Sequence, residues 1–213
     1  MHKTGLCLVI ALLAATGAQA QEIYLKAGLP GYGIGFAQPL GPLFTVRADF
    51  LTLGERRERR TEDGIDYDGR LEASRGALLA DLFPFAGSFR ISAGVTAAKY
   101  RLDLVATGAG GTITVGNTTY TTTANDRFEV QVKMPSTMPY LGIGWGHHSQ
   151  SGLRFSFDIG AAVGKARLGY QLSGPWASQV SQQDIDAELA ELRDGVGKVR
   201  AIPQVTLGIG YSF

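Results

Sequence analysis

Residues 203–213 read PQVTLGIGYSF, and this stretch decides the fold. Apolar side chains fill every second position, and the residues between them are polar or glycine. Such a strict period of two predicts a β-strand with one apolar face and one polar or small face. The apolar set is Val205, Leu207, Ile209, Tyr211 and Phe213, so that face ends on an aromatic residue.

This final segment resembles the C-terminal β-signal of Gram-negative outer-membrane proteins. In such barrels the apolar face of a strand contacts lipid, the polar face lines the lumen, and aromatic residues form a girdle at the membrane interface. The resemblance implies that Tyr211 and Phe213 form an assembly signal. It also implies that the barrel assembly machinery is a partner during biogenesis.

The other end of the chain predicts a secretory signal peptide over residues 1–20. A basic start is followed by the apolar run Gly5–Ala15 and by Ala18-Gln19-Ala20, a small-x-small cleavage site. The run is too short for a transmembrane anchor, which needs about 20 apolar residues. Cys7 is the only cysteine and lies in this leader, so residues 21–213, the expected barrel domain, contain no thiol.

The composition argues against several classes of function. The formal net charge is +1, and the loss of Lys3 with the leader would bring it to zero, so nucleic-acid binding has no electrostatic support. The 29 glycines are spread through the alternating segments rather than gathered in linkers, as in barrel lumens and at bends of a sheet. Nothing in the sequence indicates a cofactor or a metal site.

The interior of the chain predicts an all-β fold, an antiparallel transmembrane barrel with one short helix in a long loop. Short turns at 39–42, 84–88 and 147–152 alternate with long connections at 54–64, 106–126 and 173–197, as expected for periplasmic turns and outer loops. Seven long segments are visible. Splitting the first at Gly28-Leu-Pro-Gly31 gives eight strands, the even number we expect, and splitting the fifth at its prolines is the alternative.

The helix is predicted from Ser181, a helix-capping residue, to Gly195. Its apolar stripe, Ile185, Leu189 and Leu192, is expected to pack on the barrel mouth rather than on lipid or a partner. A small hairpin is predicted around Gly116-Asn117.

Three strand segments change their apolar phase partway along. In the fourth segment, apolar residues are odd-numbered up to Ala97 and even-numbered from Tyr100. A shared change of this kind could mark β-bulges at one level of the barrel. We favour a second interpretation, in which the distal halves extend beyond the membrane and need no lipid-facing pattern.

Charged residues occupy the inward face of several strands at membrane level. An eight-stranded barrel is just wide enough for its side chains to fill, and buried charges must be paired. We therefore expect a polar core rather than an open pore, with a narrow conduit or ligand pocket as the alternative. The six residues of this predicted network are Arg47, Asp49, Asp81, Arg90, Arg154 and Asp158.

Two polar stretches carry residue types that could support chemistry or binding. His147 and Ser149 are spaced as in outer-membrane lipid A deacylases, which they resemble, but Gln150 replaces the asparagine of that family and no glutamate follows. Asp158, the nearest acid, points to the lumen by its phase, so we expect a polar turn. The second stretch, Glu55-Arg-Arg-Glu-Arg-Arg60, is either a solvated loop or a contact for lipopolysaccharide phosphates.

In its pattern, the whole of residues 21–213 resembles small outer-membrane barrels of the OmpW, OmpX and OmpA-domain kind. The resemblance implies a place in the cell outer membrane, with outer-membrane lipid and lipopolysaccharide as partners. A structural or binding role without catalysis is the leading hypothesis. A passive conduit for small hydrophobic molecules is the second, and a lipid A deacylase-like hydrolase is the third.

Overall fold

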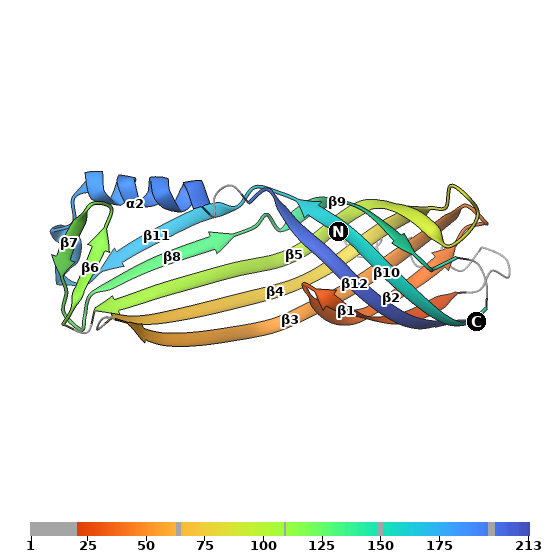
Figure 1. Cartoon of the computed structure of the whole chain (residues 1–213), viewed down its shortest axis with the longest axis horizontal. Coiled ribbons are helices and arrows are strands. Elements are labelled where there is room, and N and C mark those ends of the chain that lie inside the picture. Colours follow the sequence, from red (N-terminus) through yellow and green to blue (C-terminus); the bar gives the residue numbers. More distant parts are fainter. Residues whose placement is uncertain (1–20, 63–64, 109, 149–150, 196–198) are drawn as a thin grey trace, which may run out of the picture.

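A computed structural model of the chain describes residues 21–62, 65–108, 110–148, 151–195 and 199–213. The predicted signal peptide lies outside these residues. Within them, no helix is long and apolar enough to cross a membrane. The molecule is elongated, with a barrel at one end and a sheet that extends beyond it at the other (Figure 1).

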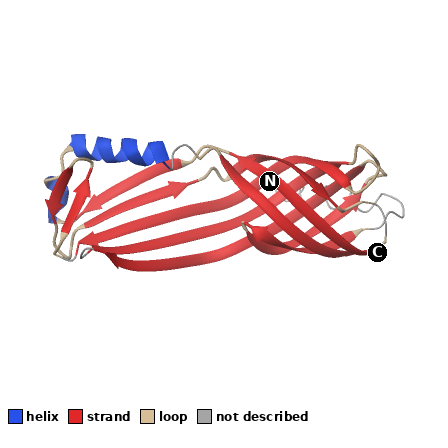
Figure 2. Ribbon diagram, in the orientation of Figure 1, coloured by secondary structure: helices blue, strands red, loops and turns tan. Residues whose placement is uncertain are grey.

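Strands account for most of the described chain, and its helices lie at the end of the molecule away from the barrel (Figure 2). The strands are β1 (Glu22–Leu29), β2 (Gly31–Pro39), β3 (Phe44–Glu62), β4 (Ile65–Leu82), β5 (Phe89–Gly108), β6 (Thr112–Val115), β7 (Thr118–Thr121), β8 (Arg127–Lys133), β9 (Thr137–Trp145), β10 (Gly152–Val163), β11 (Arg167–Ser173) and β12 (Ala201–Ser212). A short 3-10 helix, η1 (Pro175–Ser178), and an α-helix, α2 (Gln182–Gly195), precede β12.

Eight antiparallel strands close into a ring, which confirms the predicted barrel. The order is β1-β2-β3-β4-β5-β9-β10-β12, and β12 closes on β1 from Glu22 opposite Ser212 to Leu29 opposite Val205. The even number arises from the split of the first segment, because Pro30 separates β1 from β2. Gln21, the first described residue, and Phe213 lie at one end of the barrel, where Gln21 N donates to Phe213 O at 3.0 Å.

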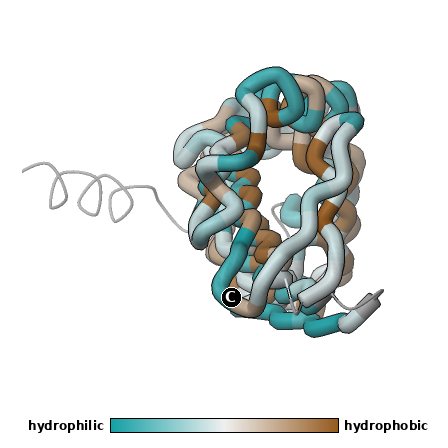
Figure 3. The backbone as a smooth tube through the Cα atoms, turned by 90° about the vertical axis from the view of Figure 1, so that its left-hand side faces the viewer, coloured by the Kyte–Doolittle hydropathy of each residue, from teal (hydrophilic) through white to brown (hydrophobic). Residues whose placement is uncertain are grey.

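The barrel exterior is apolar and its interior is polar. On β12, Leu207 is 65% exposed while the neighbouring Thr206 is 4% exposed. Buried and exposed positions alternate in the same way on β1, on the barrel part of β5 and on β9. Figure 3 looks along the molecule from the extension and shows hydrophilic and hydrophobic residues intermixed along the chain. Exposed apolar side chains in a continuous belt are what a bilayer solvates well and water does not.

Beyond the ring, three strands continue without interruption into an open sheet, which we call the extension. It consists of the distal parts of β3, β4 and β5, followed by β8 and β11. The prediction of a loop at 54–64 was therefore wrong, because β3 pairs with β4 as far as Glu62 opposite Ile65. A bulge between Thr52 and Gly54 shifts the register by one residue, and the charged residues that follow are solvated strand positions.

The change of apolar phase on β5 needs no bulge. Its pairing with β4 is continuous from Ile91 opposite Leu82 to Gly108 opposite Ile65, so even-numbered residues face inward throughout. What changes between the barrel and the extension is the environment on each side of β5. In the barrel the outside is an apolar belt and the inside is polar, whereas in the extension the inside is an apolar core and the outside is exposed. Tyr100 is accordingly buried inside.

Strands β8–β9 and β10–β11 are each interrupted at the boundary between ring and extension. Beyond the pair of Ala162 with Tyr140, the next pair is Arg167 with Lys133, so the β8–β9 side has two more residues than the β10–β11 side. These breaks fall at residues 134–136 and 164–166. Irregularity is thus present at this level, but on these strands and not on β5.

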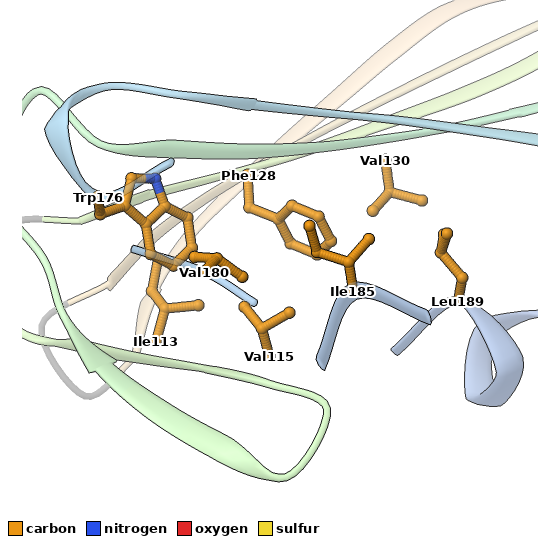
Figure 4. Close-up of a cluster of buried hydrophobic side chains, with 8 residues drawn as sticks. All are labelled: Ile113, Val115, Phe128, Val130, Trp176, Val180, Ile185 and Leu189. Atoms are coloured by element: carbon orange, nitrogen blue, oxygen red, sulfur yellow. The ribbon is translucent and has the colours of Figure 1, made fainter. Parts of the chain in front are cut away.

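The extension has its own hydrophobic core, built by α2, the β6–β7 hairpin and β8 (Figure 4). Helix α2 begins as predicted, since Ser181 Oγ accepts from Asp184 N at 3.1 Å. Its stripe, Ile185 and Leu189, packs on the hairpin and β8 rather than on the barrel mouth. The reason is that the strands carry the loop well beyond the mouth. The full cluster is Ile113, Val115, Phe128, Val130, Trp176, Val180, Ile185 and Leu189.

Candidate functional site: the charged lumen

Charged side chains meet in the lumen by reaching across glycines. Tyr24 on β1, Gly35 on β2 and Asp49 on β3 lie in one row of the sheet. The Tyr24 hydroxyl donates to the Asp49 carboxylate over the glycine. A Cβ on Gly35 would lie within 2.4 Å of three atoms of the Tyr24 side chain, so the missing side chain makes room for this contact.

A second row repeats this arrangement, here with an ion pair across the glycine. Arg90 on β5 and Asp158 on β10 both pair with Gly144 on the strand between them. An Arg90 Nη2–Asp158 ion pair spans the glycine, and Arg90 Nη1 also donates to Gly146 O at 2.8 Å. A Cβ on Gly144 would lie 2.8 Å from Asp158 Oδ1 and 2.9 Å from Arg90 Nη2.

Arg47 joins the two rows. Its Nε donates to Asp81 Oδ2 at 2.5 Å and its Nη2 to Asp81 Oδ1 at 3.1 Å, a two-pronged contact that fixes the guanidinium plane. Ser92 Oγ donates to Asp81 Oδ1 at 2.6 Å. Arg47 Nη2 also lies 3.4 Å from Asp158 Oδ1, and Nη1 lies 3.9 Å from Asp49 Oδ2, so the guanidinium is within salt-bridge distance of three carboxylates.

Two further cations belong to this cluster, and the sequence analysis missed them. Lys26 Nζ lies 3.1 Å from Asp49 Oδ2 and 2.7 Å from Asp158 Oδ2. Arg75 Nη2 lies 3.5 Å from Asp49 Oδ2, and its guanidinium faces the Tyr140 ring at 5.8 Å. Both could have been found by phase, because Lys26 alternates with Leu25, which is exposed on the outside, and Arg75 shares the parity of Asp81.

Of the six predicted network residues, the structure brings five together. These are Arg47, Asp49, Asp81, Arg90 and Asp158, each at most 5% exposed. Arg154, the sixth, has the inward phase but lies near the end of the barrel that holds Gln21 and Phe213. There its guanidinium contacts His148 Nε2 at 3.3 Å and Ser151 O at 3.4 Å.

An apolar layer lies in the lumen next to the charged one, toward the extension. Met138, Tyr140 and Leu79 are each at most 5% exposed and form a cluster with small residues of β4 and β10. Tyr140 fills the space that glycine leaves, since a Cβ on Gly160 would lie 2.3 Å from its hydroxyl. An aromatic side chain covering a glycine in this way stabilises a strongly curved sheet. Charged and apolar layers together fill the cross-section.

His147 lies at the other end of the charged layer and is completely buried. Its Nδ1 is 3.0 Å from Glu22 Oε1, and its ring packs on Tyr24 with centroids 4.3 Å apart. The acid beside His147 is therefore Glu22 and not Asp158. Ser149 and Gln150 lie outside the described residues. Within the described part of the chain, no group of three or more potential ligands is arranged to hold a metal ion.

The charged stretch 55–60 forms ion pairs along the extension. Glu55 pairs with Arg57 and Arg70, Arg59 with Asp68, and Arg60 with Glu58. Most of these side chains are well exposed, so each pair adds little stability. What the pairs do is neutralise charge on the outer part of β3, which forms one edge of the open sheet.

No model of a known protein family matches the chain, and neither does any curated protein. Solved structures do. A structure titled as CarO of Acinetobacter baumannii aligns with a TM-score of 0.57 at 18% identity, covering 90% of this chain and 97% of that one. One titled as CarO2 from the same organism gives 0.58 at 16% identity, covering 92% and 99%.

A major outer membrane protein from Thermus thermophilus aligns with a TM-score of 0.47 at 13% identity, covering 92% of this chain and all of that one. At these identities the likeness to the two Acinetobacter structures concerns the fold. It agrees with the resemblance to small barrels that the sequence carries.

Proposed function

We propose that the chain is an integral outer-membrane protein whose barrel is a closed scaffold with a structural and binding role. The observation that carries this proposal is the filled lumen. The side chains of Tyr24, Arg47 and Arg90 are each no more than 1% exposed and belong to one continuous charged cluster. Opening a pore would separate these charges inside a low-dielectric wall, which costs several kcal/mol for each ion.

The apolar belt supports membrane insertion, and the position of the turns supports the orientation. Short turns join β2 to β3 and β4 to β5 at the end that holds Gln21 and Phe213, whereas the extended parts of β3, β4 and β5, and the long β5–β8 connection with its β6–β7 hairpin, lie at the other. Long connections of outer-membrane barrels face outward. The extension therefore projects from the cell, with outer-membrane lipid and lipopolysaccharide around the barrel and the barrel assembly machinery acting before insertion.

Non-catalytic function is part of the proposal. The His147 ring is enclosed in the lumen against Tyr24 and Glu22, away from the exterior where an acyl chain would lie. A hydrolase needs its base within reach of both nucleophile and substrate. Buried here, His147 acts as packing for the charged layer.

Binding or passage of small hydrophobic molecules is the second candidate function, favoured by a crevice in the extension. This crevice has a volume of about 260 Å³ and is lined mainly by apolar residues, among them Leu104, Ile113, Phe128 and Leu192. It lies beside the helix core rather than on a route through the filled lumen. The observation therefore favours capture of an apolar molecule more than its conduction.

Conductance in planar bilayers tests the main proposal. Insertion is first established by a shift in gel mobility on heating and by protease protection in proteoliposomes. We expect inserted wild-type protein to give no steady single-channel conductance. A steady conductance of the untreated protein would contradict the closed scaffold, and failure to insert would contradict the membrane assignment itself.

A further inference from the structure

A basic cleft lies where the barrel passes into the extension. It occupies about 760 Å³ between the break that follows β10, the C-terminal end of α2 and the start of β12. Four exposed cations surround it, and Pro135, Ala166 and Leu168 supply apolar wall. The cations are Lys165, Arg167, Arg193 and Arg200.

Among the described residues, none of those that line the cleft is acidic, and no salt bridge involves any of its four cations. The arginines of β3 differ, since Arg57, Arg59 and Arg60 each face a carboxylate within 2.7 Å. Concentrated positive charge without an internal partner is suited to an external anion.

The cleft also lies at the border of the apolar belt. Val163, the last residue of β10, is half exposed on the outside and precedes Lys165 by two positions. Val199, also partly exposed, directly precedes Arg200. Arginine and lysine beside the last lipid-facing residues lie at the depth of headgroups, where their apolar stems rest against the belt and their charges reach phosphate.

We propose that this cleft binds the phosphate groups of lipid A, the membrane anchor of lipopolysaccharide. The inference rests on the proposed function, because the outward orientation of the extension places the cleft in the outer leaflet. Arg193 and Arg200 can each present two parallel N–H groups of a planar guanidinium to a phosphate, whereas a lysine ammonium acts as a point charge. The lipid acyl chains would lie on the belt below, along Val163 and its neighbours on β9 and β12.

The test measures binding of lipid A to the purified, folded protein in zwitterionic detergent micelles. The variant carries Arg193→Gln with Arg200→Gln, and the matched control carries Arg57→Gln with Arg59→Gln, which removes as much charge from β3. A surface cation contributes about fivefold to binding of anionic lipid. We therefore expect roughly 25-fold weaker binding by the cleft variant and less than twofold change in the control.

Three probes distinguish the sources of phosphate. Dephosphorylated lipid A should bind wild type about as weakly as diphosphorylated lipid A binds the cleft variant. Phosphatidylglycerol and inorganic pyrophosphate should each bind at least tenfold more weakly than lipid A, and equal affinity for either would overturn the assignment to lipid A. Equal loss in both double variants would reduce the effect to general charge and would also overturn it.

Two controls keep the result interpretable. Gel mobility shows whether the double variant folds. If it does not, the salt dependence of lipid A binding to wild-type protein tests the inference instead. Phosphate contacts predict a clear loss of affinity between about 50 and 500 mM salt, whereas a purely apolar contact predicts none. Failure of the inference is distinguishable from failure of the proposed function. If the protein inserts into bilayers but the cleft variant binds lipid A as tightly as wild type, the proposed function stands and only the lipid A site is refuted.

Discussion

Arg90 and Asp158 form an ion pair although the whole of β9 lies between their strands. The contact is possible because Gly144, the residue of β9 in that row, has no side chain to stand between them. Tyr24 and Asp49 meet across Gly35 in the same manner on the other side of the barrel. The glycines of the lumen thus determine which charges can be neighbours.

Gly144→Ala should separate the Arg90–Asp158 pair. Its Cβ would lie less than 3 Å from a backbone carbonyl as well as from both charged groups, so either the strand or the pair must move. We expect a loss of about 3–5 kcal/mol, the range for breaking a buried ion pair. Urea unfolding in detergent, followed by tryptophan fluorescence, measures it. Gly169→Ala, where a Cβ would meet nothing within 4 Å, is the control.

Removing one charged side chain from the lumen network should destabilise the protein more than removing a cation outside it. Arg90→Ala leaves Asp158 with fewer cations and should cost about 3–5 kcal/mol, whereas Arg154→Ala, at a partly exposed position by the turn, should cost about 1 kcal/mol or less. Unfolding midpoints of both variants are compared with wild type. Equal effects would show that the network is not the stabilising unit of the lumen.

The extension should lose stability in acid through Asp184. Hydrogen bonds from the Ser181 and Tyr120 hydroxyls hold the pKa of this carboxyl below its usual value. A lowered pKa in the folded state means that the stabilisation is complete above the ordinary value near 4 and disappears as the pH falls through the folded value. Fluorescence of Trp176, buried in the adjoining core, should report the change between about pH 5 and 2. Asp184→Asn should reduce this pH dependence but not abolish it, because the Asp126 carboxylate accepts a hydrogen bond from Trp176 N and its pKa is also lowered.

Phe213→Ala and Tyr211→Ala should slow assembly. Both aromatic side chains are 59% exposed on the apolar side of β12, where the resemblance to a β-signal places the recognised face. The rate of insertion in cells, read by the heat-modifiable gel band, should fall for both variants and should be unchanged for Gln204→Ala on the lumen side. Insertion as fast as that of wild type would argue against the assembly-signal interpretation.

Alternation was enough to predict the ring, because lipid outside and side chains inside impose a period of two on every spanning strand. It placed Arg47, Asp81 and Asp158 inward for the same reason. Phase alone, however, gives direction and not depth, so Arg154 could not be distinguished from the residues of the network. The loop predicted at 54–64 failed for a related reason. Charges on both sides of a strand are typical of loops, and only pairing with β4 shows otherwise.

The basic cleft could not be predicted from the sequence at all. Arg193 comes from a helix, Arg200 directly precedes a strand and Lys165 comes from a strand break, and no spacing along the chain links them. Other members of the charged cluster that the sequence analysis missed could have been predicted. Tyr24 and Lys26 stand on a short strand whose alternation is clear once Pro30 is taken as its end.

The uninterrupted strands have a mechanical consequence. Strands β3, β4 and β5 join the barrel to the extension as one continuous beam, while β8–β9 and β10–β11 are each broken at the same height. A load applied to the far end of the molecule is therefore carried by three strands on one side, and compliance is concentrated at residues 134–136 and 164–166 on the other. The extension should therefore bend more readily toward the side of the broken strands, and the basic cleft lies at the level where this bending occurs.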